Sequence, residues 1–300
     1  MIHGVLNIYK EPGWTSHDVV AKLRGILRQK KIGHTGTLDP QAEGVLPVCL
    51  GKATKLCDLL TEETKSYEAV LLLGQVTDTQ DTTGEVLSEK PVLVSEEEVK
   101  AAAASFQGEQ LQVPPMYSAL KVGGKKLYEL AREGKEVERK ARPVHFYEIQ
   151  VLDTDLPRVR LHVTCSKGTY IRTLCHDLGE RLGCGGCMEK LIRTRVGIFH
   201  KENSLPLARV EELVREGNLE SYIAGIPELF PDLAQVRALP QEDRYLDNGN
   251  PIYRSMVEEP DLWQEGTQVR MYKSSGEFVG IFRCDKATEK FAPVKMFLQD

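Results

Sequence analysis

One short segment of the 300-residue sequence gathers side chains that could act on a substrate. Residues 33–40 read Gly-His-Thr-Gly-Thr-Leu-Asp-Pro, and Asp39 is the single carboxylate among them. No helix or central strand accommodates this composition, so we expect a loop, and loops on a rigid scaffold commonly carry reactive groups. Asp39 could therefore serve as a catalytic carboxylate. An aspartate before a proline is also common in turns without any catalytic role, and the residues alone leave both interpretations open.

Other chemical motifs are absent or incomplete. A phosphate-binding loop needs Gly-Lys-Ser/Thr at the start of a helix, and a serine nucleophile elbow needs Gly-x-Ser-x-Gly, but neither pattern occurs. Cys184 and Cys187 have the spacing of half a zinc site, without an evident second pair of ligands nearby. The seven cysteines are odd in number and scattered, which is typical of reduced thiols. The sequence therefore predicts neither a metal site nor thiol chemistry.

Helix and strand patterns alternate irregularly around this loop. Apolar residues at helical spacing predict helices over residues 17–29 and 170–182, and a capping box at Ser95 predicts a third helix after it. Strand patterns cover residues 5–9, 67–73, 144–152, 159–165 and 192–199. Because the regular spacing of a doubly wound sheet is missing, we expect an α+β fold with a mixed, mostly antiparallel sheet.

The pattern changes after about residue 230. Prolines and an Asn-Gly turn separate short strand candidates at residues 268–272, 278–283 and 294–298, which is typical of a small all-β module. We therefore expect a catalytic domain over residues 1–230 and a C-terminal module over residues 231–300.

Composition and charge limit the class of protein. With 41% hydrophobic and 28% charged residues, the chain is neither disordered nor fibrous. It has no export signal and no apolar run of about 18 residues, so we expect a cytoplasmic protein without a membrane partner. The net charge of −5 conceals two basic segments, residues 117–145 and 158–195. Such segments can neutralise phosphates, although solvated helix faces have the same composition.

Six blocks of sequence together resemble one family in their order and spacing. They lie at residues 10–16, 33–40 with 44–47, 65–67, 114–119, 163–172 and 191–199. Across about residues 3–200 the chain resembles the TruB-type tRNA pseudouridine synthases, and beyond residue 230 it resembles the PUA-like RNA-binding module of that family. The resemblance implies a pseudouridine synthase fold and isomerisation of the uridine at position 55 in the TΨC loop of tRNA, as in the bacterial enzyme.

The resemblance also implies roles for five residues. Asp39 would be the nucleophile, or the base if a glycal forms, and Arg172 would pair with it and favour its charged form. Tyr67 and Tyr170 would enclose the target base, and Tyr67 would take the C5 proton late in the reaction. Leu191 would be an apolar contact of the same pocket. The isomerisation is redox-neutral and needs no group donor, so it implies no cofactor and no metal.

Recognition of the RNA requires further residues under the same resemblance. The target nucleotide must leave its stack, and His34 would fill the vacated position. The predicted phosphate contacts are Lys10, Lys22, Arg28, Lys30, Lys31 and Arg193.

The implied partner is the TΨC stem-loop of tRNA, bound by a monomer without a guide RNA. One alternative is a tRNA-folding chaperone or RNA-binding protein for which modification is secondary. Another is a subunit of a guide-RNA particle, as are related eukaryotic and archaeal enzymes. Loss of activity with retained tRNA binding in an Asp39 variant would separate the enzyme from the chaperone.

Overall fold

The computed structural model describes residues 1–258 and 264–298, and the chain divides into two compact units. The larger unit contains Asn7–Val48 and Leu56–Leu219, whereas the smaller unit contains Met1–Leu6, Cys49–Lys55 and Glu220–Asp300. The expected boundary at residue 230 lies within the smaller unit. The functional division into residues 1–230 and 231–300 therefore stays a prediction.

Three helices of the larger unit confirm the predicted ones, to within two residues at each end that was predicted. They are α1 (Ser16–Leu27), α3 (Glu96–Ala104) and α5 (Ile171–Arg181). At the start of the first helix, the Thr15 hydroxyl accepts from the Asp18 amide, and the Asp18 carboxylate accepts in return from the Thr15 amide. Ser95 and Glu98 form the same capping box at α3. The helices that were not predicted are α2 (Cys57–Thr61), α4 (Leu127–Arg132) and α6 (Leu207–Glu216).

A mixed sheet forms the centre of the larger unit. Its order is β1-β3-β12-β4-β11-β10-β7, with β2 beside β3 and β13 beside β12. β3 and β12 run parallel, whereas β12–β4, β4–β11, β11–β10 and β10–β7 are antiparallel, which confirms the expected mostly antiparallel sheet. The strands are β1 (Gly4–Lys10), β2 (Ile32–His34), β3 (Glu43–Leu50), β4 (Lys65–Leu73), β7 (Gly108–Gln112), β10 (Arg142–Asp155), β11 (Arg158–Cys165), β12 (Gly186–Val196) and β13 (Phe199–His200). Two small hairpins are separate from it, β5 (Gln75–Thr77) with β6 (Val86–Glu89) and β8 (Lys121–Val122) with β9 (Lys125–Lys126).

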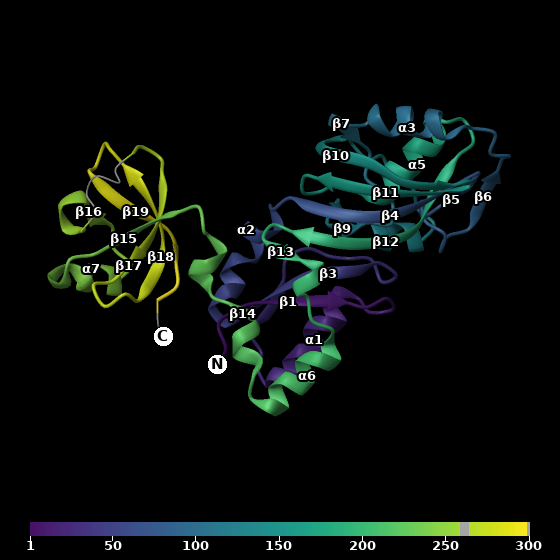
Figure 1. Cartoon of the computed structure of the whole chain (residues 1–300). Helices are drawn as coiled ribbons and strands as arrows, with labels where there is room; N and C mark the ends of the chain where they lie inside the picture. The colour runs from purple at the N-terminus through teal and green to yellow at the C-terminus, as the bar shows by residue number, and fades with distance from the viewer. Residues whose placement is uncertain (259–263, 299–300) are drawn as a thin grey trace. The chain divides into compact units, whose positions relative to one another are not determined.

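The core of the larger unit lies where helices cover the sheet. Figure 1 shows α3 and α5 on one face of the β10, β11 and β4 strands, and α1 beside α6. The alternation in β11 buries Val159, Leu161 and Val163 in the same apolar cluster as Leu174 of α5. The residues around the end of β4 and the start of α5 are therefore held on a packed scaffold.

The smaller unit has its own five-stranded sheet. The order is β15-β17-β18-β19-β16, with β15 parallel to β17 and the other pairs antiparallel. Val269, Phe282 and Phe291 are buried in its core. The sheet confirms the predicted PUA-like β module, to which α7 (Asp243–Asp247) adds a short helix. Its strands are β15 (Ala234–Arg237), β16 (Ile252–Tyr253), β17 (Gln268–Tyr272), β18 (Phe278–Asp285) and β19 (Lys290–Met296), and β14 (Ile223–Ala224) pairs with Val5 and Leu6.

No helix among the described residues is long and apolar enough to cross a membrane. The longest of them, α1, has 12 residues. A helix needs about 20 apolar residues to span the hydrocarbon core of a bilayer.

The parallel contact between β3 and β12 depends on a glycine. Gly44 lies opposite Arg193 with a φ of +108°, and a Cβ at this position would lie 2.2 Å from the Arg193 carbonyl oxygen. We expect Gly44→Ala to lower the free energy of unfolding by about 3 kcal/mol or more, because backbone strain adds to a backbone clash. Urea denaturation measures the change. Gly217→Ala is the control, since Gly217 has a φ of +74° with open space around it and should cost only about 1 kcal/mol.

Candidate active site

The loop that carries Asp39 is fixed at several points. Its first two residues, Gly33 and His34, belong to the short strand β2, so the loop is shorter than residues 33–40. The Leu38 amide donates to the Ser16 hydroxyl at 3.0 Å, and the Lys10 ammonium donates to the Pro40 carbonyl at 3.0 Å. Asp39 therefore lies between two anchored neighbours, which limits the positions its carboxylate can reach.

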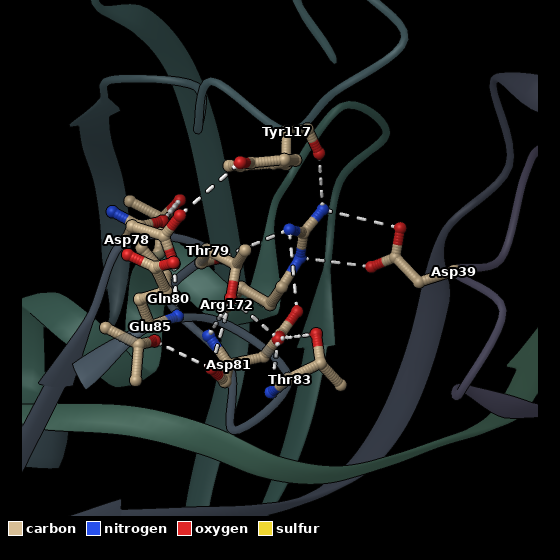
Figure 2. Close-up of polar contacts among 11 residues, drawn as sticks. Asp39, Asp78, Thr79, Gln80, Asp81, Thr83, Glu85, Tyr117 and Arg172 are labelled. Atoms are coloured by element: carbon tan, nitrogen blue, oxygen red, sulfur yellow. Dashed lines mark hydrogen bonds and ion pairs between the residues drawn. The ribbon is translucent and has the colours of Figure 1, made fainter. Parts of the chain in front are cut away.

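Asp39 and Arg172 are 133 residues apart in sequence and form an ion pair, as Figure 2 shows. Arg172 Nε lies 3.0 Å from Asp39 Oδ2, and Arg172 Nη2 donates to Asp39 Oδ1 at 3.3 Å. The Arg172 side chain is only 6% exposed, whereas that of Asp39 is 42% exposed. The carboxylate is thus held by a buried guanidinium and stays accessible to a substrate.

Arg172 also joins two other segments to the site. Its Nη1 donates to the Thr79 carbonyl at 3.1 Å, and its Nη2 donates to the Tyr117 carbonyl at 2.8 Å. Asp81 lies 3.6 Å from Nη1 and accepts hydrogen bonds from the hydroxyl of Thr79 and the amide of Thr83. The guanidinium therefore fixes Asp39 relative to the turn between β5 and β6 and to the segment before β8.

Sequence reasoning missed Asp81 and the Tyr117 carbonyl. Residues 78–84 read Asp-Thr-Gln-Asp-Thr-Thr-Gly, and two carboxylates spaced among hydroxyls were a signal for a structured turn. The role of a main-chain carbonyl such as that of Tyr117 cannot be predicted from residue type, because every residue has such a carbonyl.

Burial and charge act on the Asp39 carboxyl in opposite directions. Burial raises its pKa, the Arg172 guanidinium lowers it, the Asp81 carboxylate raises it and the Lys10 ammonium lowers it. The net direction is upward. A carboxylate with a raised pKa is a better proton acceptor than an ordinary surface aspartate, provided that it remains ionised.

Two tyrosines and a leucine lie on the elements that meet at this site. Tyr67 of β4 and Leu191 of β12 are each 7% exposed and belong, with Leu38, to one apolar cluster. Burial raises the pKa of Tyr67 to about 12. Tyr170 precedes α5, and Gln112 of β7 holds its backbone through a hydrogen bond from the Tyr170 amide at 2.8 Å and one to the Tyr170 carbonyl at 3.0 Å. The structure therefore supplies apolar and aromatic walls on rigid elements.

His34 lies at the entrance to the loop with its ring against that of His17. The ring centroids are 5.3 Å apart in an edge-to-face arrangement. Burial lowers the pKa of His34, and the nearby His17 lowers it further. The Nδ1 atom of His34 is enclosed and makes no hydrogen bond within the described part of the chain. A neutral imidazole ring is suited to stacking against a nucleobase.

The structure corrects the expected surface positions of two cations. Lys10 is 0% exposed and Arg193 is 1% exposed, so neither offers a free charge to a phosphate in this structure. The reason is local, because the Lys10 ammonium binds the carbonyls of Glu11 and Pro40. Among the other predicted phosphate contacts, Arg28, Lys30 and Lys31 are exposed, and Lys22 is exposed but paired with Glu211.

The Cys184 and Cys187 pair, which has the spacing of half a zinc site, lies inside the larger unit. Cys184 and Cys187 are buried free thiols. Within residues 1–258 and 264–298, no three His, Cys, Asp or Glu side chains are grouped to hold a metal ion.

Comparison with known proteins identifies the family. Residues 24–171 match the N-terminal domain of the TruB family pseudouridylate synthases, and residues 172–229 match the tRNA pseudouridylate synthase B C-terminal domain. The chain belongs to the TruB family. The resemblance in the sequence blocks, the pseudouridine synthase fold and the enzyme class are thereby confirmed.

Several relatives of this TruB-family chain match it over nearly its whole length. The tRNA pseudouridine synthase B of Lachnoclostridium phytofermentans is 50% identical over 99% of this chain and 100% of the relative. The tRNA pseudouridine synthase B of Bacillus pumilus is 40% identical over 100% of this chain and 99% of the relative.

Solved structures show the same fold. A Cbf5-Nop10-Gar1 complex contains a chain that is 28% identical, with a TM-score of 0.74 over 99% of this chain and 85% of that one. An H/ACA RNP bound to a substrate RNA containing 2'-deoxyuridine contains a chain that is 26% identical. Its TM-score is 0.73 over 99% of this chain and 86% of that one.

Proposed function

We propose that this chain isomerises the uridine at position 55 in the TΨC loop of tRNA to pseudouridine. The observation that carries the proposal is the accessible Asp39 carboxylate held by the buried Arg172 guanidinium in a chain of the TruB family. Relatives that are 40–50% identical over almost the whole chain are tRNA pseudouridine synthases B, which supports tRNA as the substrate.

The reaction explains why a carboxylate is needed. The bond between ribose C1′ and N1 of the base breaks, the base turns, and C1′ bonds to C5. While the base is detached, Asp39 either bonds to C1′ or, in the glycal route that we favour, removes a ribose proton and later returns it. Arg172 orients the carboxylate in both routes and favours its ionised form before Asp39 reacts. The proton lost from C5 is balanced by one gained at N1, so no oxidant or donor takes part.

The base must leave the RNA stack before it can turn, which costs a few kcal/mol. In this proposal the neutral ring of His34 takes the vacated position and offsets part of that cost. Tyr170 and Leu191 enclose the extruded uracil, and Tyr67 accepts the C5 proton. These roles are supported by the positions of the four side chains on β2, β4, β12 and the start of α5.

We also propose that the protein acts on tRNA without a guide RNA and that it acts as a monomer. It would do so in the cytoplasm, where it would encounter tRNA. The relatives at 40–50% identity are tRNA pseudouridine synthases B, whereas the Cbf5 and H/ACA structures are 26–28% identical. We therefore favour a stand-alone enzyme over a subunit of a guide-RNA particle. A chaperone role would require binding without the chemistry of Asp39.

The test is incubation of the purified protein with one unmodified tRNA labelled with tritium at uridine C5. Tritium release followed by mapping of the modified position should show conversion at position 55 only. Release that requires added RNA or protein would favour the particle subunit, and tRNA binding without release would favour the chaperone.

If exposed lysines and arginines bind the phosphates of tRNA, the affinity for tRNA should fall steeply as the salt concentration rises. Lys31 is exposed in the described structure, so Lys31→Ala should reduce the slope of log affinity against log salt by about one unit. Filter binding at several salt concentrations measures the slope. Lys100→Ala on α3 is the control and should leave it unchanged, because Lys100 is paired with Glu96. An unchanged slope in Lys31→Ala would contradict the contact.

A further inference from the structure

Arg193 of β12 is a buried cation at the junction of three strands. It lies opposite Tyr67 in the antiparallel pair with β4 and opposite Gly44 in the parallel pair with β3. Directly opposed residues of neighbouring strands point to the same face of a sheet, so the Arg193 and Tyr67 side chains are neighbours. Arg193 is the largest side chain of the protein that is less than 2% exposed within the described residues.

The donors of Arg193 connect Tyr67 to the loop of Asp39. Its Nε donates to the Val45 carbonyl at 2.7 Å, and its Nη2 contacts the Gly36 carbonyl at 3.5 Å. Tyr67 lies directly opposite on β4, and its hydroxyl and the guanidinium are close enough to shift each other's pKa. The guanidinium is thus held by one main-chain carbonyl within the loop and one on β3 after it, next to the phenol of Tyr67.

Arg193 differs from Arg172 in the groups that surround its charge. In the parts of the chain described by the structure, no carboxylate lies within ion-pair distance of its guanidinium, in contrast to Arg172 with Asp39 and Asp81. Burying an unpaired cation is unfavourable in free energy, because carbonyl dipoles offset only part of the hydration that it loses. The neighbouring group that can acquire negative charge is the Tyr67 hydroxyl.

The titration behaviour of the pair is consistent with this arrangement. Burial raises the pKa of Tyr67 to about 12, and the positive charge of Arg193 opposes that increase. Burial lowers the pKa of Arg193, and Tyr67 opposes that decrease. Each group therefore favours the charged form of the other.

We propose that Arg193 is a positioning residue that orients the Tyr67 hydroxyl and stabilises negative charge on its oxygen when the C5 proton is transferred. This inference rests on the proposed function. Tyr67 releases its hydroxyl proton to water, and the resulting phenolate takes the proton from C5 to become a phenol again. The electron pair of the C5–H bond restores the C5–C6 double bond, and N1 takes a proton from water, so protons and charge balance.

The first test is Arg193→Met in single-turnover reactions at saturating protein. Product formation should slow by roughly 10²- to 10³-fold, the usual effect of removing one donor that stabilises an oxyanion, because less of Tyr67 would be present as phenolate. Uridine deuterated at C5 distinguishes the step, because a slow C5 proton transfer gives an isotope effect larger than that of the wild type. Arg195→Met on the same strand is the control and should keep the wild-type isotope effect. An unchanged isotope effect in Arg193→Met would overturn the inference.

The second test asks whether Arg193 acts through Tyr67. Tyr67→Phe lacks the oxygen, so adding Arg193→Met to it should slow the reaction little further. Losses that multiply in the double variant would show that Arg193 acts elsewhere, and they would overturn the inference. Circular dichroism and tRNA binding report whether each variant folds.

Should Arg193→Met fail to fold, Arg193→Lys decides the question. A lysine keeps the charge but cannot hold the Val45 and Gly36 carbonyls and Tyr67 together in a fork, so we expect a smaller loss with the same enlarged isotope effect. A wild-type isotope effect in Arg193→Lys would overturn the inference. Failure of the wild-type protein to modify tRNA would instead overturn the proposed function.

Discussion

Asp39→Asn should abolish release of the C5 hydrogen from tRNA while tRNA binding is largely retained. Asparagine has nearly the same shape, but it can neither bond to ribose C1′ nor accept the ribose proton. We expect the rate to fall by roughly 10⁴-fold or more, the scale seen when a nucleophile is removed from an enzyme. Tritium release measures the reaction and filter binding measures the affinity.

The matched control for Asp39→Asn is Asp153→Asn, an exposed aspartate on β10 that contacts no residue of the site. It should react at the wild-type rate. Turnover retained in Asp39→Asn would overturn the assignment of Asp39. Loss of binding together with turnover would instead show that Asp39 helps to hold the RNA.

Arg172→Lys should also disable the enzyme, although by a smaller factor of roughly 10²- to 10³-fold. The guanidinium contacts both Asp39 oxygens and the carbonyls of Thr79 and Tyr117. A lysine ammonium is a point charge that cannot reproduce this fork, so the carboxylate would lose its orientation while the net charge is kept. Single-turnover tritium release at saturating protein measures the change in rate.

Arg181→Lys at the other end of α5 is the control for this variant. Arg181 is exposed, and its guanidinium lies over the Phe106 ring, outside the site. A wild-type rate in Arg172→Lys would contradict the role of the fork. Urea denaturation of Arg172→Met should show a loss of about 3 kcal/mol or more, because the Thr79 and Tyr117 carbonyls and the Asp81 carboxylate would lose the partner that Arg172 supplies.

The pH dependence of Arg172→Met provides a separate check on the active form of Asp39. Burial raises the pKa of Asp39 and the Arg172 charge opposes it, so removal of that charge should raise the pKa further. If the carboxylate is the active form, the rate is lost as the pH falls through this pKa. The acidic limb of the rate profile should therefore move to higher pH than in the wild type.

Local patterns in the sequence determined most of the secondary structure and the position of the candidate carboxylate. The helical spacing of apolar residues over 17–29 predicted α1, and the strand pattern at residues 159–165 predicted β11. The glycines and the proline around Asp39 predicted its loop, apart from the two residues that join β2. These features follow from interactions within a few residues, and such interactions can be deduced from neighbouring side chains.

Only the tertiary structure decided which charges are buried and what they contact. Lys10 and Arg193 were predicted to contact phosphates of the RNA, yet both are buried against main-chain carbonyls. The pairing of Arg172 with Asp81 and with the Tyr117 carbonyl likewise joins segments 55–91 residues apart. Burial of a charge depends on partners supplied by distant strands, and a carbonyl partner has no residue type by which a sequence could reveal it.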